Sequence, residues 1–252
     1  MRTSPEAPEW LAAYTAAERP DLWEKAVQDN VFEGVWPKYN LFGNQAARYF
    51  GELYPRFADT QILFIDERTG NPVARGQTIP FRWDGTLEDL PAGIDAVGLR
   101  GVEAAGEPSA LSALAAEVLG EYKMEGLSRQ IVAAMGEAAR NRGLSAFVAP
   151  VRPFWKDWYP LTPIEKYARW KQDGGLPFDP WMRVHVRMGA EIVRPEPRSM
   201  EITAPVKDWQ SWTGMVFPED GDYVFPKGLA PLTITGGTGS YWEPNVWMRH
   251  PL

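Results

Sequence analysis

Apolar residues recur along the chain with two different periods, which predicts both helices and strands. Helical spacing, with apolar residues three and four positions apart, is found in five segments: 22–32, 44–57, 128–143, 163–172 and 179–189. Short apolar runs that predict strands occur in four others: 60–67, 72–83, 109–119 and 144–151. The Ala and Leu content of 109–119 is also compatible with a helix. The alternation of the two kinds of segment favours a mixed α/β or α+β fold.

The connections between these segments indicate how the sheet is built. A Gly/Asn/Pro turn joins 60–67 to 72–83, as in an antiparallel hairpin. The strand–turn–helix–strand unit over 109–151 predicts a right-handed crossover between two parallel strands. Residues 84–108 carry only a weak helical pattern, so we expect an irregular excursion there.

The last part of the chain is rich in aromatic residues and contains further strand-like runs. These runs predict three strands followed by an aromatic tail: strands at 190–195, 198–206 and 229–237, and a tail at 240–248.

No composition shift separates two domains. We expect residues 1–20 to form a loosely packed lead-in with one short helix, followed by a single domain over 21–252. Its core is expected at about 21–195, and an aromatic-rich C-terminal elaboration at about 196–252.

Composition excludes several classes of function. The net charge of −7 argues against nucleic acid as a partner, because binding to phosphates needs a basic face. The absence of Cys excludes disulfides, thiolate catalysis and Cys-ligated metal, and only two His argue against a metal site. No apolar run approaches the roughly 18 residues of a membrane span, and the N-terminus lacks the pattern of a signal peptide. We therefore expect a cytoplasmic protein with no membrane partner.

A turn between the strand predicted at 109–119 and the helix predicted at 128–143 is a candidate phosphate site. The N-terminus of a helix offers free backbone N–H groups and the positive end of the helix dipole, which suit a pyrophosphate. On spacing alone, an ordinary loop with a glycine is the alternative. The candidate binding residues of the turn are Lys123, Met124, Glu125, Gly126, Leu127 and Ser128.

This turn resembles the phosphate loop of the GNAT acyltransferases, Q/R-x-x-G-x-G/A. Lys123, Gly126 and Ser128 stand at its three motif positions. A second segment, 184–193, is similar to the family's L-Y-x-x-x-G-F segment, with His185 at the Tyr position and Gly189 in register. Longer phrases such as GLPFDPWMRVHVRMGAEI and YWEPNVWMRH resemble a bacterial branch of GNAT-like proteins. The similarity covers about 20–250.

The resemblance implies a mixed, mostly antiparallel central sheet flanked by helices, and acetyl-CoA or another acyl-CoA as co-substrate without a metal. The loop departs from the family pattern at several positions: Lys123 replaces Gln or Arg, Met124 stands where many members have Gly, Glu125 adds a negative charge, and Ser128 replaces Gly or Ala. These departures favour weaker CoA binding or a different acyl carrier.

The resemblance also assigns candidate roles in acyl transfer. Glu117, Val118 and Leu119 would run alongside the pantetheine, with the backbone N–H of Val118 or Leu119 polarising the acyl carbonyl. Glu117 is the candidate general base, or else an outward residue or the partner of an Arg. His185 is the candidate acid for the thiolate, or else a histidine packed on the sheet, and Tyr167 could take its place.

Aromatic residues after 152 are candidates for the wall of an acceptor pocket, or else part of a satellite core. They are Trp155, Trp158, Tyr159, Trp170 and Trp181. Arg152 and Arg183 could meet an anionic acceptor, although surface ion pairs are the ordinary explanation. His250 is expected to be solvated.

Together these features predict an acyl-CoA-dependent N-acyltransferase, with acetyl as the expected acyl group, acting on a small amine-bearing metabolite. One alternative keeps the fold but uses acyl-CoA or an acyl-carrier thioester for sensing, or for chemistry such as decarboxylation. Another is an interaction module with an aromatic surface. An acyl carrier protein and a homodimer are left open as partners.

Overall fold

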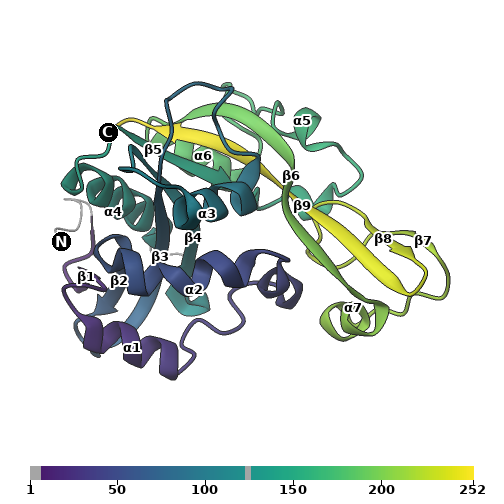
Figure 1. Cartoon of the computed structure of the whole chain (residues 1–252), viewed down its shortest axis with the longest axis horizontal. Coiled ribbons are helices and arrows are strands. Elements are labelled where there is room, and N and C mark those ends of the chain that lie inside the picture. Colours follow the sequence, from purple (N-terminus) through teal and green to yellow (C-terminus); the bar gives the residue numbers. More distant parts are fainter. Residues whose placement is uncertain (1–6, 123–125) are drawn as a thin grey trace.

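The structure is a computed structural model that describes residues 7–122 and 126–252. Its strands form one mixed sheet (Figure 1). They are β1 (Leu11–Thr15), β2 (Ile62–Asp66), β3 (Asn71–Phe81), β4 (Ala110–Val118), β5 (Ala146–Val151), β6 (Glu191–Pro205), β7 (Gly221–Tyr223), β8 (Leu232–Thr235) and β9 (Thr238–His250). The neighbour order is β1-β2-β3-β4-β5-β9-β8-β7, with β6 on the other edge of β9. Among the described strands only β4 and β5 pair in parallel, which confirms the predicted mostly antiparallel α/β sheet.

Helices cover both faces of this sheet. The α-helices are α1 (Pro20–Gln28), α2 (Ala46–Phe57), α3 (Gly93–Glu103), α4 (Leu127–Asn141), α5 (Ile164–Tyr167), α6 (Pro180–Arg187) and α7 (Val206–Thr213). Short 3-10 turns occur at η1 (Lys38–Phe42), η2 (Ala58–Thr60), η3 (Gly120–Tyr122) and η4 (Lys156–Trp158).

Alternation of side chains along the strands shows which helices share a face. In β2, Ile62 and Phe64 pack in the core under α4, whereas Leu63 and Ile65 pack with α1. Helices α2 and α3 lie on the α1 side, and α5 and α6 lie on the α4 side. We call these the α1 face and the α4 face.

The strands β4 and β5 and the helix α4 between them agree with the sequence pattern. The apolar run predicted at 109–119 forms β4, and the helix predicted at 128–143 forms α4. Gly143, just beyond α4, has φ of +71°, the left-handed conformation that ends a helix. The parallel crossover and the 60–67/72–83 hairpin are confirmed as well.

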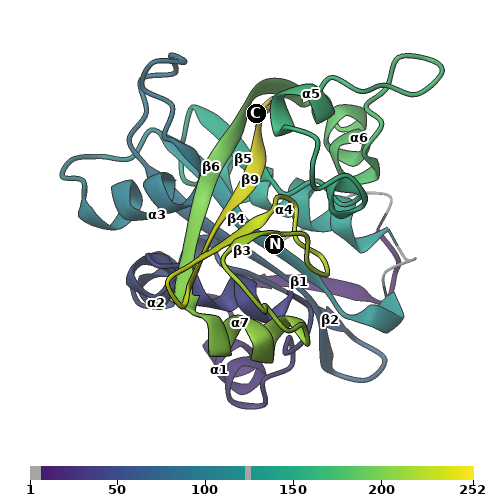
Figure 2. The same cartoon turned by 90° about the vertical axis from the view of Figure 1, so that its right-hand side faces the viewer.

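The C-terminal segment predicted as an aromatic tail is instead a long strand inside the sheet. Val246–His250 of β9 pairs with β5, and Thr238–Ser240 pairs with β8. Along its other edge β9 pairs with β6, which merges the two strands predicted at 190–195 and 198–206 (Figure 2). The prediction failed because long-range pairing, which local sequence does not report, fixes this segment.

Other segments also differ from their predictions. The described part of the lead-in contains β1, whose Leu11 and Ala13 are buried against β2, so it is not loosely packed. The excursion at 84–108 contains α3, and the helix expected at 163–172 is limited to Ile164–Tyr167.

The second half of β6, the first half of β9, α7, β7 and β8 project from the main body as an arm (Figure 1). The arm has its own apolar core, in which Trp209 and Tyr241 are fully buried. Tyr39 of η1 packs into this core, so the segment before α2 joins the arm to the body.

A close contact holds α2 against α3. A Cβ placed on Gly98 of α3 would lie 2.5 Å from Cγ of Tyr49 in α2. The hydroxyl of Tyr49 donates to Asp95 Oδ1 at 3.0 Å. The two helices approach this closely only because position 98 has no side chain.

We expect Gly98→Ala to lower the free energy of unfolding by about 1–3 kcal/mol, the usual effect of overpacking. Gly136→Ala is the matched control, because Gly136 is also helical and its Cβ would lie 3.7 Å from Phe147. That change should raise stability by about 0.5–1 kcal/mol through helix propensity. Urea unfolding of both variants measures this, and equal effects would contradict the role given to position 98.

Candidate active site

The parallel strands β4 and β5 separate after a short paired stretch. Their pairing is confined to Ala110–Ser112 with Ala146–Val148, although both strands continue beyond it. Beyond the paired stretch, each strand is held only by its neighbour on the outer side, β3 for β4 and β9 for β5. Backbone groups on the facing edges are therefore left without sheet partners, an arrangement suited to a ligand that carries amides.

Hydrogen bonding of β4 decides which backbone N–H group faces this divergence. The register with β3 shifts at Leu114, a β-bulge. The N–H of Leu119 donates to the carbonyl of Val73 in β3 at 3.0 Å, so it is not available to an acyl carbonyl. Because alternate residues of an antiparallel strand point to opposite sides, the N–H of Val118 points toward the divergence. Of the two predicted polarisers, the geometry is compatible with Val118.

The turn before α4 has the backbone expected for an anion site. Gly126 has φ of +71° and occupies the N-cap position of α4, where no side chain of the described residues caps the helix. The side chain of Leu127 is buried in the core, so only its backbone could contact a ligand, and Ser128 is half-buried. Lys123, Met124 and Glu125 lie outside the described residues.

His185 of α6 and His250 of β9 form a buried pair on the α4 face. Nδ1 of His185 lies 2.8 Å from Nε2 of His250, and Trp181 packs edge-on to His185 at 4.4 Å. Burial lowers the pKa of His185 to about 3 and that of His250 to about 4, so both rings are uncharged at neutral pH. The prediction that His250 is solvated was wrong, because β9 carries it into the sheet.

The neutral state limits what His185 could do. An imidazolium acid is not populated at neutral pH, which leaves a neutral ring nitrogen as the group that could contact a thiolate. Nε2 of His185 is buried and, within the described chain, has no hydrogen-bond partner.

Glu117 lies on the α1 face at the end of β4 and is almost fully buried. Its Oε2 accepts from Nε of Arg75 in β3 at 2.6 Å, and its Oε1 accepts from Nε1 of Trp36 at 3.1 Å. The guanidinium of Arg75 stacks on Phe32, 4.7 Å from the ring centre. Glu117 therefore has Arg75 as its ion-pair partner, and its role as general base stays a prediction.

A second buried carboxylate lies on the α1 face near the end of β5. Glu243 of β9 accepts hydrogen bonds from Nε of Arg152 and from the hydroxyl of Tyr241. Asn40 donates to the same carboxylate at 3.3 Å, and Arg152 also donates to the hydroxyl of Tyr39 at 3.2 Å.

The aromatic residues proposed for a pocket wall lie on the α4 face instead. Tyr159 and Trp170 pack with Tyr167 and Phe178 in the core beneath α5 and α6. Trp155 stacks on Trp158, which is exposed, and Trp181 lies beside His185. Tyr159, Trp170 and Trp181 thus belong to a satellite core, the alternative that the sequence also allowed, whereas the stacked pair Trp155–Trp158 is not part of that cluster.

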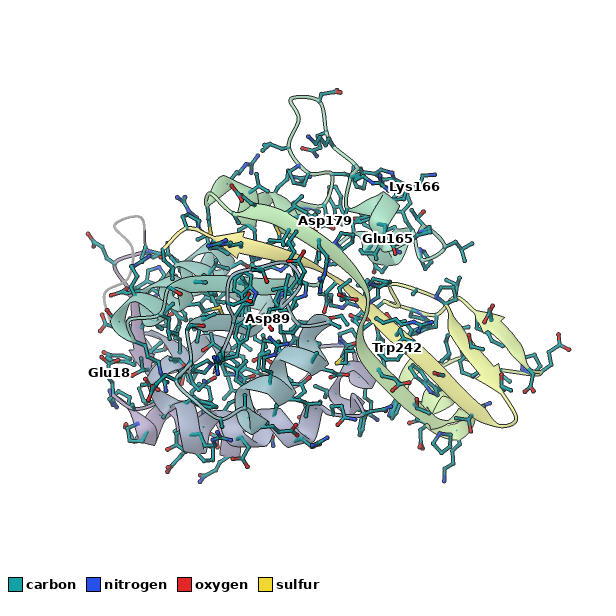
Figure 3. The ribbon with its side chains drawn as sticks, turned by 45° about the horizontal axis from the view of Figure 1, so that its top comes forward. Glu18, Asp89, Glu165, Lys166, Asp179 and Trp242 are labelled. Atoms are coloured by element: carbon teal, nitrogen blue, oxygen red, sulfur yellow. The ribbon has the colours of Figure 1, made fainter. Side chains whose placement is uncertain are left out.

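Tyr167 is fixed within this satellite core. Its hydroxyl donates to Oδ2 of Asp179 at 2.9 Å, and burial raises the pKa of the phenol. Asp179 caps α6 by accepting from the N–H groups of Trp181 and Met182. It lies near α5, whose Glu165 is labelled in Figure 3. This places Tyr167 in a structural network.

Sequence reasoning missed Trp36, Arg75 and Glu243. Trp36 and Arg75 are far from Glu117 in the chain, and no local pattern marks such a contact. Glu243 had a usable signal, because a carboxylate within an aromatic strand-like run needs a buried partner.

The described residues contain no group of three or more His, Cys, Asp or Glu side chains placed to share a metal ion. No helix within 7–122 or 126–252 is both long and apolar enough to cross a bilayer.

Solved structures show the same fold. The loading GNATL domain of CurA from Lyngbya majuscula matches with a TM-score of 0.63 and 16% identity, over 96% of this chain and 98% of that chain. A GNAT-like decarboxylase, GphF, in complex with isobutyryl-CoA matches with a TM-score of 0.55 and 17% identity, over 95% and 97%. No family model matches the chain.

A curated relative settles the family. Arginine N-acetyltransferase avaD of Aspergillus versicolor is 31% identical over 278 residues, covering 97% of this chain and 95% of the relative. The chain belongs to the GNAT superfamily, as its sequence resemblance predicted, and it is a GNAT-type acyltransferase. Membership of a bacterial branch stays a prediction.

The His185–His250 pair predicts a loss of stability in acid. In the unfolded chain both rings bind protons below about pH 6.5, whereas in the fold they do so only near pH 4 and 3. Their contribution is therefore complete above pH 6.5 and is lost as the pH falls toward 4 and 3, on the order of a few kcal/mol for the pair together.

Urea unfolding at pH 7 and pH 5 measures this loss. The double variant His185→Gln/His250→Asn lacks both titrating rings, so its stability should change less over this range than that of the wild type. An equal change in both proteins would show that carboxylates, and not this pair, cause the acid sensitivity.

Proposed function

We propose that this protein transfers an acetyl group from acetyl-CoA to the amine of a small metabolite, with arginine as the first acceptor to test. The observation that carries the proposal is the divergence of β4 and β5 beside an uncapped helix N-terminus. The acceptor is suggested by the name of the relative from Aspergillus versicolor, which aligns with almost the whole chain.

The donor would enter from the α4 face. The pyrophosphate would meet the N–H groups of the first turn of α4 after Gly126, where the left-handed residue opens the helix end. The pantetheine would lie in the divergence, with its amides against the free edges of the two strands. The N–H of Val118 would then donate to the acyl carbonyl and stabilise the oxyanion.

The acceptor would enter from the α1 face, where Glu117 lies. The amine nitrogen attacks the acyl carbon, the C–N bond forms, and the C–S bond breaks with its electron pair on sulfur. Glu117 takes the proton from the amine, directly or through water, and a proton is delivered to the thiolate. His185, on the α4 side with a neutral ring nitrogen that has no hydrogen-bond partner among the described residues, is our candidate for contacting the leaving sulfur.

The ion pair with Arg75 holds the carboxylate of Glu117 in place for this role. Arg75 and Trp36 fix the carboxylate in one orientation, so an incoming ammonium meets a positioned acceptor.

Binding and turnover test the proposal separately. Calorimetric titration with acetyl-CoA should give saturable binding that Gly126→Trp abolishes, and mass spectrometry should detect acetylated arginine. Absence of binding to any short acyl-CoA at about millimolar concentration would overturn the donor assignment. Release of carbon dioxide from malonyl-CoA without an acylated amine would instead favour the decarboxylation that the sequence left as an alternative.

We expect Glu117→Gln to lower kcat by about 100-fold or more, because the amide cannot accept the proton of the amine. The dissociation constant of acetyl-CoA should stay within about twofold, since Glu117 faces away from α4. Steady-state kinetics and titration measure the two effects.

Glu196→Gln is the matched control for that variant. Glu196 is also a carboxylate partly buried against an arginine, 3.3 Å from Arg194, but it lies in β6 away from the divergence. Its variant should keep wild-type kcat. An equal loss in both variants, or unchanged kcat in Glu117→Gln, would remove Glu117 from the chemistry.

A further inference from the structure

Arg152 is held by the protein along one edge of its guanidinium only. Nε donates to Glu243, and Nη2 donates to the hydroxyl of Tyr39 at 3.2 Å and to the carbonyl of Lys227 at 2.7 Å. Nη1 makes no hydrogen bond within the described chain and is not among the enclosed unpaired atoms. Nη1 is therefore not fully enclosed, although the Arg152 side chain as a whole is only 17% exposed.

The partners of Arg152 fix its orientation. Glu243 is 1% exposed and is itself held by Tyr241 and Asn40. The hydroxyl of Tyr39 donates to the same carbonyl of Lys227 at 2.7 Å, which closes a small network around Nη2. A guanidinium held in this way has lost its rotamer freedom before any ligand arrives, so binding through Nη1 carries a reduced entropic cost.

The side chain of Arg152 lies on the same face of the sheet as Glu117. Ala146 and Val148 of β5 pack on the α1 face, and alternation along the strand places Arg152 on that face too. Its contact with Tyr39 of η1 agrees with this placement. Arg152 follows the end of β5 as Glu117 precedes the end of β4, so the two residues flank the divergence.

One short segment connects the cluster around Glu117 to the cluster around Arg152. Trp36 donates to Glu117, and three residues later Tyr39 accepts from Arg152. Three residues of extended chain span at most about 11 Å. The two clusters therefore border the same stretch of chain between α1 and α2.

We propose that Nη1 of Arg152 binds a carboxylate of the acceptor, so that the substrate class is free amino acids and not simple amines, amides or peptides blocked at the carboxyl end. This inference rests on the proposed function and specifies its acceptor. Nη1 can donate a charge-assisted hydrogen bond to one oxygen of that carboxylate, while the amine of the same molecule is directed to Glu117. Arg152 is then a specificity residue and Glu243 is its positioning residue.

The test compares acceptors that differ only in the carboxylate. Arginine, argininamide and agmatine all keep the amine and the guanidinium, but only arginine keeps the charged carboxylate. Wild-type protein should acetylate arginine with a kcat/KM about 10- to 100-fold above that for the other two, the usual effect of losing a charge-assisted contact. This comparison needs no variant and does not depend on the folding of one.

Variants then assign the preference to Arg152. Arg152→Gln should lower kcat/KM for arginine by about 10- to 100-fold and leave that for agmatine within about threefold, which abolishes the preference. Arg152→Lys should keep part of it, because the charge remains without the fixed fork. Arg194→Gln is the control, because Arg194 also donates to carbonyls and a carboxylate but lies elsewhere, and it should keep the wild-type ratio.

The possible outcomes distinguish a failure of the carboxylate assignment from a failure of the proposed acetyl transfer. Acetylation of agmatine as fast as arginine, or a preference that survives Arg152→Gln, overturns the carboxylate assignment alone. Acetylation of none of the three amines, together with no acylated product from lysine, overturns the proposed function and this inference with it.

Discussion

The separation of two parallel strands is the constraint on which the rest of the site depends. Each of β4 and β5 is held by a neighbour on its outer edge, so the inner edges cannot close without breaking the sheet. An open edge inside a sheet is costly unless another molecule supplies hydrogen bonds. The bulge at Leu114 and the commitment of Leu119 to β3 then leave the N–H of Val118 to face the opening.

The sheet also separates two chemical environments. The α4 face carries the glycine turn, the neutral histidine pair and an aromatic satellite core. The α1 face carries two buried carboxylates, Glu117 and Glu243, each paired with an arginine. This asymmetry suits a reaction in which a thioester and a cationic amine approach from opposite sides.

The long strand β9 links the arm to the body. Its second half pairs with β5, and its first half lies in the arm, where Trp242 is labelled in Figure 3. Glu243 lies near the root of the arm and holds Arg152, so the packing of the arm fixes a side chain beside the divergence. Tyr39 reinforces this link, because it packs in the core of the arm and also contacts Arg152.

The sequence by itself determined the elements whose signals are local. The apolar periods of β4 and α4, the hairpin turn, the Asp179 cap and the glycine turn at 126 are all set within a few residues, and so is the family resemblance. Tertiary structure decided the rest. Whether 240–248 is a tail or a strand, whether His250 is solvated, and which arginine pairs with Glu117 depend on contacts between residues far apart in the chain. Such contacts are selected by burial and by the need to pair polar groups, and no local pattern of residues records them.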